Sequence, residues 1–443
     1  MKKDDNDRIF NPASATDYVP LPQLRGLQLE RLKRTVMNAY HNQRQGLFKQ
    51  RMAAADVKPD DIRCLEDIRR LPFSVKADLR ETYPYGMFTA PQKDVVRLHA
   101  SSGTTGKPIV VGYTKKDITV WSDAMIRAMS AAGLSSKDVI QVSYGYGLFT
   151  GGLGAHYGAE TLGATVVPTS GGNTERQIMV MQDFGVTAIC CTPSYFLHIA
   201  EKASEMGIDL RTLKLRAGVF GAEPWSEAMR HRIQGETGIK AYDIYGLSEI
   251  IGPGVAMECQ EQSGLHVFED YFYPEVIDPE TMQPLPDGKE GELVLTTLAK
   301  EAIPMIRYRT RDITAIMPEQ CACGRTIRRI RRIGRRSDDM MIIRGVNVYP
   351  SQIEAAILKI KGLMPHYEIV LTREGGLDNM EIRVEVTPEL FDDRIRGVES
   401  LQKQIAYAVF STVGIHAKVT FAESKSIARS EGKAKRIIDK RGI

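Results

Sequence analysis

The stretch ASSGTTGKP, residues 100–108, separates two short apolar runs and decides how the rest of the chain is interpreted. It holds two glycines, four hydroxyl side chains and the single lysine Lys107. Glycines let the backbone turn tightly, so that amide N–H groups can point at phosphate oxygens, while hydroxyls and a lysine add donors and positive charge. The stretch therefore predicts a loop that binds a polyphosphate, in preference to a turn without a ligand.

This loop differs from the phosphate loop of P-loop nucleotidases. That loop has a longer spacing between its glycines, and a serine or threonine after its lysine holds magnesium. Here only two residues separate Gly103 from Gly106, and Pro108 follows Lys107. The sequence therefore excludes a P-loop nucleotidase and indicates another kind of nucleotide site.

Apolar runs alternate with amphipathic segments on both sides of the loop. Runs 95–100 and 109–113 predict flanking strands, and a helical stripe over 118–132 ends at Gly133. The alternation then predicts strands at 139–143, 165–167, 188–192, 217–221 and 240–245, with helices at 153–162, 174–185 and from 226 onward. Such alternation predicts an α/β fold whose mostly parallel sheet is covered on both faces.

The two ends of the chain show other patterns. Residues 23–55 carry an apolar stripe at helical spacing and predict one long helix, whereas runs 292–297 and 311–316 indicate a small β unit. After an arginine-rich stretch, mixed patterns predict a small α+β domain, with strands at 341–348, 381–386 and 419–422 and a helix from 351. We therefore expect a large domain, residues 1–337, and a small domain, residues 338–443.

Composition is that of an ordinary globular protein, with 43% hydrophobic and 26% charged residues. The net charge of +4 is too small over 443 residues to indicate a nucleic-acid partner. No apolar stretch reaches the length of a membrane span, and the first residues lack the apolar segment of a signal peptide. Six cysteines are too few for a disulfide framework in a chain of this length. We expect a cytoplasmic protein.

Residues 102–108, SGTTGKP, resemble the signature loop of the adenylate-forming superfamily of acyl-CoA synthetases, adenylation domains and luciferases. Further motifs follow in the order of that superfamily: GAEP at 221–224, YGLSE at 245–249, YRTRD at 308–312, RSDD at 336–339 and SEGK at 430–433. Each motif is weak by itself. Six motifs in the right order and spacing identify the chain as a member of the superfamily.

The resemblance implies a role for each motif. It places Tyr245 against adenine, makes Asp312 the acceptor for the ribose hydroxyls, and makes Lys433 the catalytic lysine. It also makes Asp338 the pivot of a hinge, so that the small C-terminal domain would be mobile. Glu249 would act in catalysis by helping to hold Mg²⁺, for which a carboxylate is a suitable hard ligand.

The hinge motif departs from the usual pattern, because Gly334 is followed by both Arg335 and Arg336. Arg336 is our candidate for the nucleotide contact, and Arg335 stays open. The full set that the resemblance implies for the nucleotide is Ser101, Ser102, Gly103, Thr104, Thr105, Gly106, Lys107, Gly221, Ala222, Glu223, Pro224, Asp243, Tyr245, Gly246, Asp312 and Arg336.

Narrower features resemble the phenylacetate–CoA ligase branch of the superfamily: YGYGLFTGG at 144–152, IIRGVNVYP at 342–350 and RSEGKA at 429–434. In that branch the aromatic-glycine stretch forms part of the acyl pocket. The resemblance thus implies that Tyr144 and Phe149 face an aryl ring, with Ile244 and Pro253 nearby. Aromatic walls with glycine gaps suit a flat apolar ligand, and plain core packing is the alternative for each aromatic residue.

The implied activity is that of an ATP-dependent ligase. It would activate an arylacetic acid, in first place phenylacetate, as an acyl-adenylate and transfer it to coenzyme A, releasing AMP and pyrophosphate. ATP, Mg²⁺ and coenzyme A would be its small-molecule partners, and the resemblance suggests a homodimer. The alternatives are a ligase for indoleacetate or benzoate, an enzyme like coenzyme F390 synthetase, and a nucleotide-binding protein without ligase activity.

Cys321 and Cys323 form a close pair of thiols, and Cys259 and His266 lie upstream. Three sulfurs and one imidazole suit a closed tetrahedral Zn²⁺ site. Such a site would pin the segment after the adenine motif onto the small β unit. Buried free thiols beside a surface histidine are the alternative.

Overall fold

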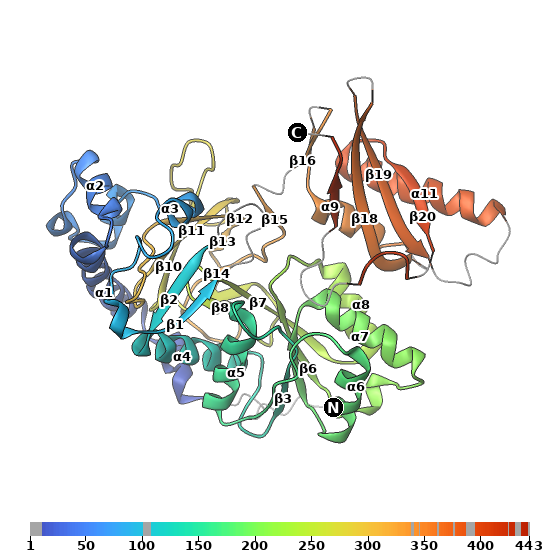
Figure 1. Cartoon of the computed structure of the whole chain (residues 1–443), viewed down its shortest axis with the longest axis horizontal. Coiled ribbons are helices and arrows are strands. Elements are labelled where there is room, and N and C mark those ends of the chain that lie inside the picture. The colour runs from blue at the N-terminus through green and yellow to red at the C-terminus, as the bar shows by residue number, and fades with distance from the viewer. Residues whose placement is uncertain are drawn as a thin grey trace.

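A computed structural model of the chain describes residues 11–100, 108–337, 341–344, 346–360, 363–374, 377–386, 395–423, 425–429 and 436–441. The loop 101–107, Asp338 and Lys433 lie outside the described residues, so their predicted roles stay predictions. The chain forms a large body with a smaller C-terminal domain at one end (Figure 1). No helix within the described ranges is long and apolar enough to cross a membrane.

A mixed sheet of nine strands forms the centre of the large body, in the order β13-β14-β9-β8-β7-β6-β5-β3-β4. The strands are β3 Val139–Val142, β4 Thr165–Val167, β5 Ala188–Cys191, β6 Ala217–Gly221, β7 Lys240–Leu247, β8 Gly252–Glu258, β9 Leu265–Val267, β13 Ile316–Met317 and β14 Arg329–Ile330. The strands from β4 to β7 pair in parallel, and those from β7 to β13 pair antiparallel. The parallel half contains the strands that the alternating pattern predicts.

Helices cover both faces of this sheet because its parallel strands are apolar on both sides. Along β5, Cys190 joins the core under two helices, while Ile189 and Cys191 join the core under three others, as strand alternation requires. The first pair is α4 Lys115–Ala131 and α5 Thr150–Leu162, and the second group is α6 Thr174–Asp183, α7 Pro193–Glu205 and α8 Glu227–Thr237. The predicted α/β fold is confirmed.

Two smaller sheets complete the large body. β1 Val95–Ala100 and β2 Val110–Thr114 form an antiparallel pair around the predicted phosphate loop. The small β unit is an antiparallel sheet in the order β10-β11-β12-β15. Its strands are β10 Phe272–Ile277, β11 Gly291–Thr297, β12 Tyr308–Thr314 and β15 Arg335–Arg336.

The N-terminal region holds two helices where the sequence predicts one over 23–55, and that prediction is wrong. Helix α1 spans Leu21–Asn42 and α2 spans Leu47–Ala54. Gly46 separates them with a φ of 65°, a left-handed conformation that glycine adopts without strain. The Gln43 side chain stabilises the break by accepting a hydrogen bond from the Phe48 amide at 2.8 Å.

The remaining helices of the large body are short. They are α3 Lys76–Glu81 and the 3-10 helices η1 Pro12–Tyr18, η2 Pro59–Asp61, η3 Leu65–Arg70, η4 Gln92–Asp94 and η5 Leu210–Thr212.

The C-terminal domain is α+β and has its own core. Its main sheet runs β20-β19-β18-β21, with β18 Leu363–Glu374, β19 Leu377–Val386, β20 Lys418–Ala422 and β21 Ile437–Asp439. Helices α9 Pro350–Ile357 and α11 Ile395–Val413 pack with it. The single strand predicted over 341–348 is wrong, because the chain turns at Arg344, whose φ is 51°, between β16 Met341–Ile343 and β17 Val346–Val348.

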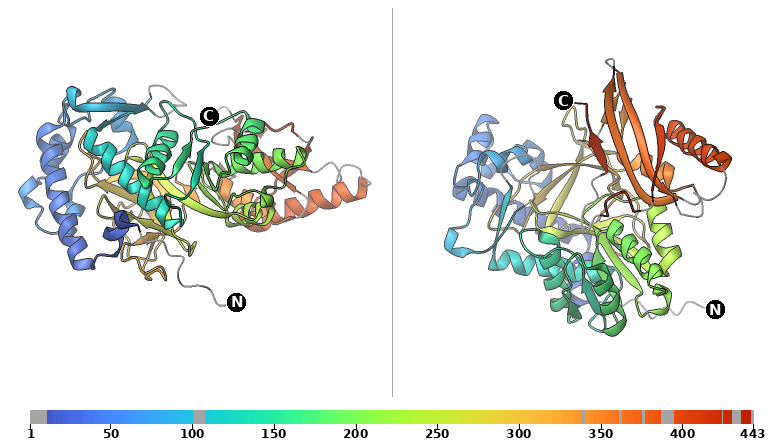
Figure 2. Two further views of the ribbon diagram at one scale, coloured as in Figure 1. Left: turned by 90° about the horizontal axis from the view of Figure 1, so that it is seen from below. Right: turned by 45° about the vertical axis from the view of Figure 1, so that its right-hand side comes forward.

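This domain rests on α7 and α8, at the end of the molecule opposite to α1 and α2 (Figure 2). Arg429 pairs with Glu201 of α7 at 3.2 Å, and Lys425 pairs with Glu205 at 2.6 Å. The Arg232 guanidinium of α8 donates to the Leu363 carbonyl at 3.0 Å. Two ion pairs and a hydrogen bond therefore cross this interface.

A buried ion cluster ties distant segments of the large body together. The Arg127 side chain of α4 is 0% exposed, and its Nη2 lies 2.6 Å from Asp17 Oδ1 and 2.8 Å from Asp270 Oδ1. Arg325 Nε also pairs with Asp17, at 3.1 Å from Oδ2. The cluster joins η1, α4, the turn before β10 and the loop before β14.

We predict that Arg127→Met destabilises the chain by about 3–5 kcal/mol, because it removes the buried cation that Asp17 and Asp270 share. Urea denaturation followed by circular dichroism measures the change. Arg211→Met is the control: Arg211 is 63% exposed and pairs with Asp209 at the surface, so less than about 1 kcal/mol is expected. An equally small effect of Arg127→Met would contradict the assignment.

Candidate active site

Two predicted nucleotide motifs meet where parallel strands end. β6 and β7 pair in parallel with Gly221 opposite Ile244, so GAEP after β6 lies beside YGLSE at the end of β7. A Cβ on Gly221 would lie 2.3 Å from the Ile244 carbonyl oxygen, which explains the glycine. Ala222 follows with a φ of 69°, a strained conformation for a residue with a side chain.

Tyr245, Asp312 and Arg336 form one hydrogen-bonded chain. The Tyr245 hydroxyl donates to Asp312 Oδ2 at 2.6 Å, and Arg336 Nη1 donates to Asp312 Oδ1 at 2.8 Å. Burial, together with the charge of Asp312, raises the pKa of Tyr245, so its hydroxyl keeps the proton that it donates. The structure thus brings together three residues from three of the predicted motifs.

The pairing of β12 with β15 distinguishes the two hinge arginines. Asp312 lies opposite Arg336 in this pair, and Ile313 lies opposite Arg335. Since neighbouring residues of a strand point to opposite faces, Arg335 points away from Asp312. It pairs with Glu290 and lies over the Tyr349 ring at 4.8 Å.

Glu249 lies in the turn after β7 and is 5% exposed. Its Oε1 is 3.4 Å from Lys76 Nζ of α3. Lys300 lies nearby, with Nζ 3.4 Å from the Glu249 carbonyl oxygen and 4.8 Å from the centre of the Tyr113 ring. Burial lowers the pKa of Lys300 to about 8, although Asp117 and Glu249 oppose the shift.

Sequence reasoning missed both of these lysines. Lys76 begins a short helix far upstream, and Lys300 follows β11 without a motif. Only the three-dimensional fold brings them to Glu249, so no spacing in the sequence could have indicated them.

Two other predicted nucleotide residues have structural partners. Glu223 Oε1 accepts a hydrogen bond from the Ser194 amide at 2.8 Å, at the start of α7. Asp243 Oδ2 lies 3.1 Å from Arg332 Nε, and the Asp243 amide donates to Glu258 at 2.8 Å. Burial and the charge of Glu258 raise the pKa of Asp243.

The predicted acyl stretch lies next to these motifs. Thr150 at the start of α5 and Ser248 of YGLSE share a hydrogen bond of 3.0 Å. The amide of Ala100, the last described residue before the phosphate loop, donates to the Leu148 carbonyl at 3.0 Å. The fold therefore places the predicted acyl stretch between the end of β1 and the turn after β7.

The four predicted acyl residues differ in burial. Tyr144 and Ile244 are buried, Pro253 is partly buried opposite Gly246, and Phe149 is 38% exposed. The Tyr144 and Phe149 ring centres are 6.4 Å apart.

Close glycine contacts hold this region in place. A Cβ on Gly154 of α5 would lie 2.5 Å from Trp121 and 2.8 Å from Pro253, and one on Gly158 would lie 2.3 Å from Met125 Cβ. Trp121 Nε1 also donates to the Pro253 carbonyl at 2.9 Å. α5 therefore lies directly on α4 and on the start of β8.

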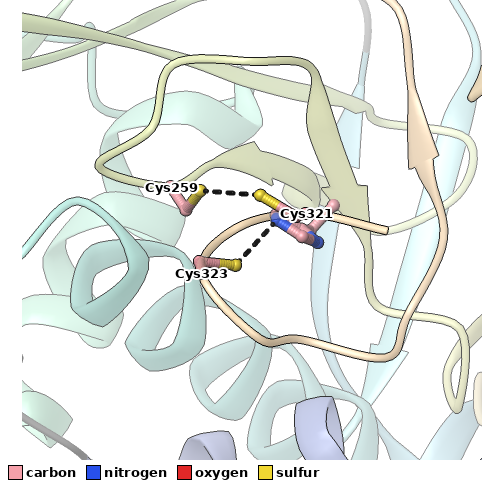
Figure 3. A group of neighbouring side chains, drawn as sticks. Cys259, Cys321 and Cys323 are labelled. Atoms are coloured by element: carbon pink, nitrogen blue, oxygen red, sulfur yellow. Dashed lines mark hydrogen bonds between the residues drawn. The ribbon is translucent and has the colours of Figure 1, made fainter. Parts of the chain in front are cut away.

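The predicted zinc ligands form a separate cluster. Donor atoms of Cys259, His266, Cys321 and Cys323 lie within 4.8 Å of one another (Figure 3). Cys259 follows the end of β8, whereas Pro253 lies near its start. Because a strand rises about 3.4 Å per residue, this cluster is roughly 20 Å from Pro253.

Comparisons with known proteins agree with these features. A family model described as AMP-binding enzyme matches residues 37–298, and one described as AMP-binding enzyme C-terminal domain matches residues 345–441. The phenylacetate–coenzyme A ligase of Pseudomonas putida is 54% identical over 94% of each chain. That of Escherichia coli strain K12 is 51% identical over 95% of this chain and 96% of its own.

A solved 2-hydroxyisobutyryl-CoA ligase is similar over its whole length. In its postadenylation state with 2-HIB-AMP the TM-score is 0.91, at 29% identity, over 100% of this chain and 96% of that chain. In its thioesterification state, with 2-HIB-AMP and CoA, the TM-score is 0.71, at 30% identity, over 99% of this chain and 95% of that chain. Because one enzyme gives both values, the difference reflects how its parts are arranged, and this chain matches the postadenylation arrangement.

We predict that Arg336→Ala weakens ATP binding by roughly ten- to a hundredfold, since a hydrogen bond to a charged group contributes about 1.5–3 kcal/mol. Arg335→Ala is a matched control one residue away and should change the dissociation constant by less than about twofold, as expected for an exposed ion pair. Isothermal titration calorimetry measures both. Equal losses of ATP affinity in both variants would show that the register of β15 against β12 does not determine which arginine contributes to ATP binding.

Proposed function

Because the chain belongs to the phenylacetate–coenzyme A ligases within the AMP-binding enzyme family, we propose that it uses ATP to join phenylacetate to coenzyme A. The observation that carries this proposal is the meeting of three groups of residues at one edge of the sheet. The first group is Tyr245, Asp312 and Arg336. The second group is Glu249 with Lys76 and Lys300, and the third group is the predicted acyl stretch, residues 144–152.

The reaction has two steps. A carboxylate oxygen of the acid attacks the α-phosphorus of ATP, and the bond to the bridging oxygen of pyrophosphate breaks. The sulfur of coenzyme A then attacks the carbonyl carbon of the acyl-adenylate and AMP leaves, while the thiol proton passes to solvent. The first step brings two anions together, so catalysis consists largely of positioning and charge stabilisation.

The residues around Glu249 suit that task. Lys76 places an ammonium group beside this carboxylate, and Lys300 places a second one beside the Glu249 backbone carbonyl. Arg336 adds a guanidinium on the Asp312 side. We propose that Lys107 and Lys433 complete the positive surroundings of the phosphates. The polar contacts of Asp312 would orient the ribose, and Tyr245 would lie against adenine.

The Glu249 carboxylate fits a Mg²⁺ ligand. It is a buried hard oxygen donor that already faces a cation, the Lys76 ammonium. Bound there, Mg²⁺ would neutralise phosphate charge. In its absence Lys76 stabilises the carboxylate, and we propose that Lys76 moves toward the phosphates when the metal binds.

We further propose that residues 338–443 move as a unit about Asp338 between the two steps. The postadenylation arrangement supports this, because the same solved ligase also exists in a thioesterification arrangement that fits the chain less well. The ion pairs of Arg429 and Lys425 with α7 would stabilise the postadenylation arrangement. We also propose a cytoplasmic location. We propose a homodimer as well, and light scattering after gel filtration tests this oligomeric state.

We predict Mg²⁺-dependent AMP formation from ATP and coenzyme A with a clear preference for phenylacetate over benzoate, indoleacetate and acetate. Chromatography of AMP and of the acyl-CoA product measures it. Preference for another acid would overturn the phenylacetate assignment, whereas the assignment as a ligase would still stand. If no AMP forms with any of these acids, the protein is a nucleotide-binding protein without ligase activity.

The same assay tests Glu249. Glu249→Gln keeps the shape and removes the charge, so AMP formation should fall by about a hundredfold or more. Glu160→Gln, at an exposed site of α5, should keep the activity of the unmodified chain. An active Glu249→Gln variant would contradict the role of this carboxylate.

We predict that Glu201→Gln lowers adenylation severalfold, because it removes the anionic partner of Arg429 across the domain interface. Formation of the thioester from supplied phenylacetyl-AMP should stay unchanged or rise. Pyrophosphate exchange into ATP measures the first step, and release of AMP measures the second. Glu205→Gln, whose pair is more exposed, should have the smaller effect. Equal losses in both steps would mean that the contact only stabilises the fold.

A further inference from the structure

The cluster of Cys259, His266, Cys321 and Cys323 is not used by the ligase reaction. Its members come from three places: the end of β8, the strand β9, and the loop between β13 and β14. Figure 3 shows the Cys259, Cys321 and Cys323 side chains converging on one point between these segments. Cys259, His266 and Cys321 are buried and Cys323 is partly buried, so the donors are largely shielded from water.

The distances match a tetrahedral metal site. Cys259 Sγ lies 3.7 Å from Cys321 Sγ, and Cys323 Sγ lies 3.4 Å from His266 Nε2. A Zn²⁺ ion bonded at about 2.3 Å to sulfur and about 2.0–2.1 Å to nitrogen puts two sulfurs about 3.8 Å apart. The same geometry puts sulfur and nitrogen about 3.5 Å apart. A disulfide would need about 2.05 Å, so Cys259 and Cys321 are not bonded to each other.

The imidazole of His266 is already oriented for binding. Its Nδ1 lies 3.4 Å from the Ile327 carbonyl oxygen, which favours a proton on Nδ1. The lone pair of Nε2 then points toward the sulfurs. Zinc-binding histidines commonly have such a carbonyl behind them.

We propose that the chain holds one Zn²⁺ ion through Cys259 Sγ, His266 Nε2, Cys321 Sγ and Cys323 Sγ. Three thiol protons leave to solvent as the metal binds, and the complex carries one negative charge. The guanidinium of Arg325, which contacts Cys323, offsets that charge. Four protein ligands leave no open position, so the ion is structural and takes no part in the ligase chemistry.

The ion would fix a loop that otherwise lacks regular structure. Residues after Cys321 hold the N-terminal segment: Thr326 N donates to the Asp17 carbonyl at 2.8 Å, and Thr326 Oγ1 donates to the Val19 carbonyl at 2.6 Å. Arg325 also pairs with the Asp17 carboxylate. Zinc would thereby support the buried cluster of Asp17 with Arg127.

Metal analysis of the full-length protein, purified without chelator, tests the proposal independently of ligase activity. Plasma mass spectrometry should find about one zinc per chain, and a mercurial reagent that blocks thiols should release it to a metal-sensitive dye. Replacement by Co²⁺ should give the visible spectrum of a tetrahedral thiolate complex. Zinc-free protein without such a spectrum, or iron in place of zinc, would overturn the proposal.

Variants provide the matched comparison. Cys323→Ser should lose at least about 90% of the zinc and lower the melting temperature by several degrees, since structural zinc contributes folding free energy. Cys64→Ser changes an exposed cysteine outside the cluster and should keep the zinc content and the melting temperature of the unmodified chain. If Cys323→Ser does not fold, the metal content and Co²⁺ spectrum of the unmodified chain decide. Full zinc in a folded Cys323→Ser variant would mean an adventitious ion only.

Discussion

The carboxylate of Asp312 is the contact on which the arrangement of the predicted nucleotide site depends. One of its oxygens accepts from Tyr245 near the end of β7, a central strand of the nine-stranded sheet, and the other accepts from Arg336 in the last strand of the large body. The carboxylate is 5% exposed, so these donors must stay in place to compensate its charge. It therefore fixes two sheets and the approach to the C-terminal domain relative to one another.

Much of this arrangement is predictable from local patterns. The apolar runs of β3 to β7 predict a sheet because buried parallel strands are apolar on both faces, and ends of parallel strands meet at one edge. The meeting of GAEP with YGLSE follows directly. Helix α7 was missed, although Thr192 and Pro193 form a start signal in which the Thr192 hydroxyl accepts from the Tyr195 amide. The break at Gly46 was also missed, because an apolar stripe continues across it.

Other features depend on contacts that no local pattern contains. The choice between Arg335 and Arg336 follows from the register of β15 against β12, and one residue of slip would exchange them. Lys76 and Lys300 reach Glu249 from segments far apart in the chain. The cysteine and histidine cluster lies between these cases: the residue types indicate a metal site, but 62 residues separate Cys259 from Cys321. The pairing of β14 with β9 brings these segments together.

The close seating of α5 on α4 also constrains how the protein can evolve. Any side chain at Gly154 or Gly158 meets Trp121 or Met125, so this wall of the predicted acyl region can neither thicken nor retreat by single substitutions. Phe149 comes directly before the same helix and is 38% exposed. Adaptation to bulkier or smaller acids, in nature or by selection in the laboratory, should therefore begin at Phe149 and leave the glycines of α5 unchanged.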